Sequence, residues 1–163
     1  MATTRSLLYP VPWGYSQLAH PGLRMNASGK PAMRQAGQTV SVIDDDESVR
    51  RALGRLIRSF GWNVETFASA EEFLAPGEHR APACLVLDLR MPGMSGLELQ
   101  ERLAAAGRHI PVVFITGHPD ESARRAALAA GAVEFLRKPF DDRVLLDAVA
   151  RALAQDNQEG AQP

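Results

Sequence analysis

The sequence predicts an α/β domain in which helices cover both faces of a doubly wound, five-stranded parallel sheet of order 2-1-3-4-5. Five short, mostly apolar segments alternate along the chain with stretches whose apolar residues recur at helical spacing. Strands that are nearly continuously apolar are typical of a parallel sheet that is buried on both faces. Five such units in about 115 residues fit a doubly wound fold.

The first units follow one another with little linking sequence. Residues 40–43 form an apolar strand, and the apolar spacing over 49–60 predicts a helix that a glycine ends. Residues 62–67 alternate in polarity, which is typical of a strand. The sequence SAEE, a capping box, opens a short helix at 69–74. A loop with two prolines then leads to a third strand at 84–88.

The second half of the predicted domain repeats the pattern. A second capping box, SGLE, opens a helix at 95–106, and a nearly continuous apolar strand follows at 110–116. An alanine-rich helix at 120–130 ends at a glycine, and a fifth strand lies at 133–136. Apolar residues at helical spacing predict the final helix at 141–154.

Charge divides the chain into three parts. Residues 1–38 carry four basic residues, no acidic residue and four prolines, so we expect a disordered N-terminal extension. Such a leader is also typical of a targeting peptide, and a start codon placed too early would produce the same feature, with Met33 as the natural start. The domain is expected at 39–154 and a disordered polar tail at 155–163, and residues 39–163 together have a net charge of −5.

Composition disfavours several classes of protein. The chain has 163 residues and a net charge of −1, so it lacks the broad basic field of proteins that bind nucleic acids or membrane surfaces. Its one cysteine, Cys84, cannot form an internal disulfide and is expected to be a small buried apolar residue. No apolar run approaches the roughly 20 residues that span a bilayer.

Polar residues follow four of the five predicted strands at the point where each strand ends. They are Asp44 and Asp45, Asp88, Thr116 and Lys138. The carboxyl ends of parallel strands meet at one edge of a sheet, so we expect these side chains to share one crevice. Clustered carboxylates repel one another unless a cation joins them, and an all-oxygen ligand set suits Mg²⁺. An aspartate in such a site can attack phosphorus and form an aspartyl phosphate.

One lysine of the predicted domain is unusual, because almost all other basic residues there are arginines. From residue 39 onward the chain has 13 arginines and only one lysine, Lys138. Arginine and lysine are not interchangeable, because the ammonium is a compact point charge on a flexible stem. Each polar residue by itself also has a structural explanation, such as a helix cap for the aspartates or a β-branched strand residue for Thr116. Their joint position at the strand ends favours a functional site.

Four segments resemble the signature blocks of response-regulator receiver domains, the CheY-like superfamily with a flavodoxin-like fold. They are VSVIDDDESVR, CLVLDLRMPGMSGLEL, VVFITGH and GAVEFLRKPF, and their residues are most similar to those of FixJ-type receivers. The resemblance implies that Asp88 is phosphorylated. It also implies that Asp45 binds Mg²⁺ directly, that Asp44 binds it largely through water, and that Asp88 and the backbone carbonyl of Arg90 complete the metal site.

The resemblance implies further roles at the same edge of the sheet. Thr116 and Lys138 would contact the phosphoryl oxygens, and the Lys138-Pro139 peptide bond would be cis. Phe135 occupies the position of the family's switch aromatic. Phosphorylation would then draw the Thr116 hydroxyl inward, and Phe135 would follow it.

The resemblance implies a function in two-component signalling and no enzymatic activity on a separate substrate. We expect a cytoplasmic receiver that takes a phosphoryl group from a sensor histidine kinase or phosphotransfer protein. It would signal to a downstream effector protein, without direct contact to nucleic acid or membrane, and a phosphorylation-dependent homodimer is compatible with this role. Because the chain ends nine residues after Ala154, a stand-alone receiver is favoured.

Two alternatives remain open. A FixJ-type transcriptional regulator that has lost its DNA-binding domain would have the same sequence. A magnesium phosphatase of the dehalogenase type also uses an aspartate after a strand, but its chemistry needs a second acid two residues later, where this chain has Arg90.

Overall fold

The computed structural model describes residues 37–118 and 120–159, and the extension predicted at 1–38 lies almost wholly outside them. Strands and helices alternate along the described chain, as predicted. Their bounds are β1 Thr39–Ile43, α1 Glu47–Ser59, β2 Asn63–Phe67, α2 Ala70–Leu74, β3 Cys84–Asp88, α3 Gly96–Ala105, β4 Val112–Thr116, α4 Glu121–Ala129, β5 Glu134–Arg137 and α5 Asp142–Glu159.

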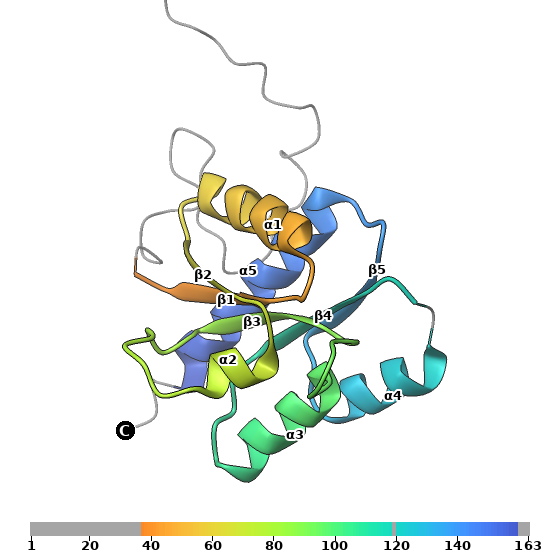
Figure 1. The fold of residues 1–163 in the computed structure, drawn as a ribbon. Helices are drawn as coiled ribbons and strands as arrows, with labels where there is room; N and C mark the ends of the chain where they lie inside the picture. Colours follow the sequence, from red (N-terminus) through yellow and green to blue (C-terminus); the bar gives the residue numbers. More distant parts are fainter. Residues whose placement is uncertain (1–36, 119, 160–163) are drawn as a thin grey trace, which may run out of the picture.

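The strands form one parallel sheet of order β2-β1-β3-β4-β5, which confirms the predicted topology. Helices α1 and α5 cover one face, and α2, α3 and α4 cover the other (Figure 1). Along β1, Val40 and Val42 pack on the first side, whereas Ile43 packs on the second. Residues buried on both faces explain why the strands read as nearly continuous apolar runs.

The helix starts follow the capping signals in the sequence. Ser95 and Glu98 form the predicted capping box of α3, since each side chain accepts a hydrogen bond from the other residue's backbone N–H. At α2, Ser69 accepts a bond from the N–H of Glu72, but the Glu72 carboxylate reaches back to Ala68 instead of Ser69. Each cap satisfies N–H groups that have no partner within the helix.

Several element boundaries differ from the prediction, most of them by one or two residues, and two of these differences have a cause in the sequence. Strand β4 begins at Val112 instead of residue 110, because Pro111 directly before it has no N–H to donate to a neighbouring strand. Helix α5 runs to Glu159, five residues past Ala154, so residues 155–159 are helical and are not part of a disordered tail. The polar composition of this segment suggested a tail, but the first helix-breaking residue is Gly160.

Among the described residues, no helix is both long enough and apolar enough to cross a bilayer. Cys84 is fully buried in β3, and burial raises the pKa of its thiol far above the usual range. The cysteine is therefore part of the core, as predicted.

Candidate functional site

The carboxyl ends of β1 and β3 bring two aspartates side by side. In the parallel register Ile43 lies opposite Leu87, so Asp44 and Asp88, the next residue on each strand, are neighbours. Asp44 is fully buried, Asp88 is 7% exposed, and Asp45 is exposed at the rim. One carboxylate oxygen from each of the three lies within 4.8 Å of the others. The convergence predicted from the strand ends is therefore present.

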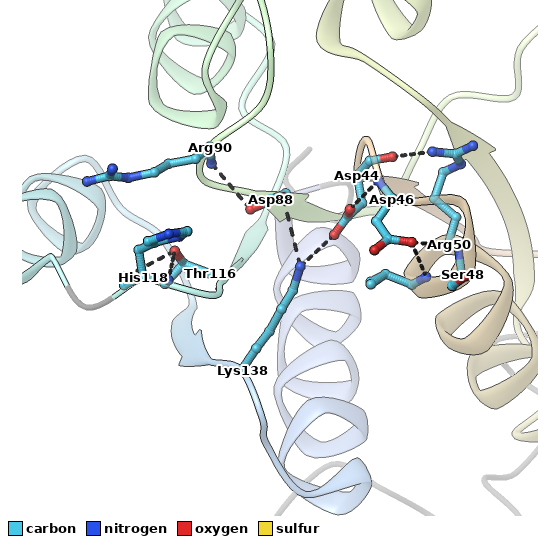
Figure 2. Close-up of polar contacts among 10 residues, drawn as sticks. Asp44, Asp46, Ser48, Arg50, Asp88, Arg90, Thr116, His118 and Lys138 are labelled. Atoms are coloured by element: carbon cyan, nitrogen blue, oxygen red, sulfur yellow. Dashed lines mark hydrogen bonds and ion pairs between the residues drawn. The ribbon is translucent and has the colours of Figure 1, made fainter.

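Local hydrogen bonds separate the roles of the three consecutive aspartates. Asp44 Oδ1 accepts a bond from the N–H of Asp46 at 2.8 Å, which holds the buried carboxylate in place. Asp46 points away from the cluster and caps α1 by accepting bonds from Ser48 and Val49 (Figure 2). Arg50 donates to the Asp44 carbonyl at 2.6 Å and so fixes the turn between β1 and α1.

Lys138 reaches the cluster from the end of β5. Its Nζ lies 2.8 Å from Asp44 Oδ2 and 3.8 Å from Asp88 Oδ2 (Figure 2). The Lys138 N–H donates to the Thr116 carbonyl at 2.7 Å, and the Lys138-Pro139 bond is cis, as expected. The ammonium therefore touches two of the three carboxylates, and its shorter contact is to Asp44.

The electrostatics of this cluster favour a bound cation. Burial and the neighbouring charge of Asp44 raise the pKa of Asp88 to about 6, although Lys138 and the N–H of Arg90 act in the opposite direction. Three carboxylates against one ammonium leave an excess of negative charge in a partly buried place. Closely spaced oxygen ligands with this charge suit Mg²⁺, so the residues present fit the metal that the sequence predicts.

Thr116, the last residue of β4, is buried at the same edge of the sheet. Its hydroxyl donates to the carbonyl of His118 at 3.1 Å and accepts from the N–H of His118 at 3.2 Å. The hydroxyl is thus engaged by its own loop in this structure (Figure 2). Phe135, on β5, is half-buried, with its ring centroid 6.2 Å from that of Phe114.

Arg90 lies in the loop after β3. Its N–H donates to Asp88 Oδ1 at 3.2 Å, so its backbone lies beside the cluster. Its guanidinium turns away from Asp88 (Figure 2). Its Nη2 lies 3.1 Å from Oδ2 of Asp120 at the start of α4. The sequence does not indicate this ion pair, because the two residues are 30 positions apart on different loops.

Sequence reasoning also missed Gly96, the first residue of α3. A Cβ built there would collide with the carbonyl oxygen of Asp88 and would lie 3.0 Å from a ring carbon of Phe114. The glycine therefore lets α3 approach the end of β3 closely, and its N–H donates to the Leu89 carbonyl at 3.0 Å. A glycine directly after a capping serine was the only signal of this approach in the sequence.

Comparison with known proteins agrees with this geometry. Residues 40–150 match the family model of the response regulator receiver domain. The chain is 42% identical over 144 residues to the response regulator protein TodT of Pseudomonas putida, covering 88% of this chain and 62% of TodT. It is 44% identical over 123 residues to the transcriptional regulatory protein FixJ of Azorhizobium caulinodans, covering 76% of this chain and 58% of FixJ.

A solved structure of the response regulator StyR superposes with a TM-score of 0.68 at 53% identity, covering 75% of this chain and 62% of StyR. The chain thus spans about three fifths of the length of these relatives. The family model, by contrast, covers most of this chain, and it includes both the sheet and the acidic cluster at its edge. By its sequence, its strand order and its acidic pocket, the chain belongs to the response regulator receiver family.

Proposed function

We propose that this domain accepts a phosphoryl group on Asp88 in a Mg²⁺-dependent reaction and passes the signal on through a change of conformation. The observation that carries the proposal is the cluster of Asp44, Asp45 and Asp88, with the Lys138 ammonium against two of its members. The proposal concerns the receiver domain at 39–154, the part of the chain that the family model covers almost entirely.

Each residue has a role in the proposed transfer. Asp44, Asp45, Asp88 and the Arg90 carbonyl would hold Mg²⁺, which when bound neutralises the carboxylates and the incoming phosphoryl oxygens. An Asp88 oxygen forms a bond to phosphorus while the bond from phosphorus to the donor's histidine nitrogen breaks. Lys138 stabilises the negative charge on the phosphoryl oxygens.

The proposed donor is a sensor histidine kinase or a phosphotransfer protein, and the receiver itself turns over no separate substrate. The output would begin at Thr116. Its hydroxyl leaves the His118 carbonyl to donate to a phosphoryl oxygen, and Phe135 moves into the space that opens. The surface of α4, β5 and α5 then differs between the two states and is read by a downstream effector or a second copy of the domain.

A matched pair of variants tests the acceptor. Incubation with Mg²⁺ and acetyl phosphate should add one acid-labile phosphoryl group to the wild-type protein and to Asp46→Asn, because asparagine caps α1 as well as aspartate does. Asp88→Asn should remain unlabelled, since the amide is no nucleophile. Equal labelling of Asp88→Asn, measured by intact mass, would refute the assignment.

A further inference from the structure

The side chain of Arg90 is held away from the residue that its backbone contacts. The N–H of Arg90 donates to Asp88 Oδ1, whereas its guanidinium points away from Asp88 (Figure 2). The guanidinium instead donates to Asp120. Arg90 is 58% exposed at its side chain and Asp120 is 30% exposed. An exposed ion pair of this kind is weak and reversible, so the guanidinium can leave when a stronger anion is nearby.

Asp120 divides its two oxygens between two tasks. Oδ1 accepts a bond from the N–H of Ala123 at 2.9 Å and caps α4, and Oδ2 binds Arg90 at 3.1 Å. The hydrogen bond from Ala123 and, as the second cause, the hydrogen bond from Arg90 hold the pKa of Asp120 below its usual range. The carboxylate is therefore charged near neutral pH, and one side chain ties the loop after β3 to the start of α4.

We propose, resting on the function proposed above, that Asp120 is a positioning residue that holds the Arg90 guanidinium away from Asp88 until a phosphoryl group arrives. A metal ion at the acidic cluster would balance the carboxylates, which leaves the guanidinium with Asp120. A phosphoryl group adds nearly two negative charges and three acceptor oxygens beside the Arg90 backbone. Arginine binds such oxygens with two parallel hydrogen bonds, which a single exposed carboxylate contact does not match.

Asp120→Asn separates the two tasks of this residue. Asparagine caps a helix as well as aspartate does, so α4 keeps its start, but the charge that holds Arg90 is lost. The released guanidinium should attract an anionic phosphodonor to the site. We expect Asp120→Asn to be phosphorylated by acetyl phosphate about two- to five-fold faster at low salt, with the gain shrinking as salt is added.

Glu121→Gln is the matched control. Glu121 lies next to Asp120 in the first turn of α4 and pairs with Arg124 at 3.3 Å, so this variant loses the same charge at the same helix end without touching Arg90. Its rate should stay within about 1.5-fold of wild type, because exposed pairs along one helix contribute little. A gain equal to that of Asp120→Asn would show that charge alone is responsible and would overturn the proposal.

The role of Arg90 is tested by a double-mutant cycle. In an Arg90→Ala background, which keeps the backbone N–H and carbonyl, Asp120→Asn should change the rate no more than Glu121→Gln does. The same gain with and without Arg90, or a slower reaction of Asp120→Asn in the wild-type background, would overturn the proposal. If the wild-type protein takes up no phosphoryl group at all, the function proposed above fails instead.

The ion pair itself can be tested without any phosphotransfer. Hydrogen exchange at the Arg90 Nε–H, followed by NMR in the unphosphorylated protein, should be at least about two-fold slower in the wild-type protein than in Asp120→Asn. Addition of beryllofluoride with Mg²⁺, a phosphoryl mimic, should shift the Arg90 signal in both proteins. The proposal would be overturned if the Arg90 Nε–H exchanged at the same rate in the two unphosphorylated proteins. It would also be overturned if the Arg90 signal did not shift when the mimic was added.

Discussion

Replacing Gly96 by alanine should destabilise the domain, although alanine is the better helix former. The added Cβ would collide with the Asp88 carbonyl oxygen and lie 3.0 Å from Phe114 and 3.1 Å from Leu87. These atoms belong to the backbone and to fully or almost fully buried core residues, so α3 must shift outward from β3. Overpacking of this kind typically costs about 1–3 kcal/mol. In a domain of this size the melting temperature should fall by at least about 3 °C.

Gly54→Ala is the control for this prediction. Gly54 is also buried in a helix, but the nearest atom to an added Cβ is the terminal nitrogen of Arg58, at 3.1 Å, which can move aside. Alanine should therefore leave stability unchanged or raise it by up to about 1 kcal/mol. Urea unfolding of both variants, followed by circular dichroism, measures the difference. If Gly96→Ala is as stable as Gly54→Ala, α3 does not approach Asp88 as closely as the structure indicates.

Three further predictions concern the metal, the switch and the N-terminal extension. Asp45→Ala should weaken Mg²⁺ binding, measured by calorimetry, and phosphorylation together, whereas Asp46→Ala should change neither; a stronger effect at Asp46 would contradict the assigned ligands. Thr116→Ala should still accept a phosphoryl group, but amide exchange over 117–145 should no longer respond to a phosphoryl mimic as it does in the wild-type protein. A chain that begins at Met33 keeps all of β1 and should match the full chain in melting temperature and phosphorylation rate; a drop of several degrees would mean that the removed residues stabilise the domain.

The site residues that could be predicted from the sequence are those whose position depends only on the backbone topology. In a parallel sheet every strand ends at one edge, so the residue after each apolar run can be assigned to that edge without any side-chain geometry. Asp44, Asp88, Thr116 and Lys138 were found in this way, and the structure places all four at the carboxyl edge of the sheet. The strand order followed from the same regular alternation of strands and helices.

The contacts between side chains could not be predicted in this way, because they depend on which groups meet in three dimensions. Lys138 Nζ lies closer to Asp44, the more deeply buried carboxylate, than to Asp88. The Thr116 hydroxyl is bonded within its own loop. Arg90 and Asp120 lie on two different loops, and the spacing of apolar residues in the sequence does not predict that these loops meet. Capping residues were predictable, by contrast, because their partners are three positions away in the sequence.

The proposed phosphorylation of Asp88 can be tested at that residue directly. Borohydride reduces an aspartyl phosphate to homoserine, so reduction of the phosphorylated protein, followed by peptide mass spectrometry, marks the acceptor residue itself. We expect homoserine at position 88, dependent on Mg²⁺ and on a phosphodonor. Homoserine at position 44 or 45, or an unmodified Asp88 in protein that has taken up a phosphoryl group, would contradict it.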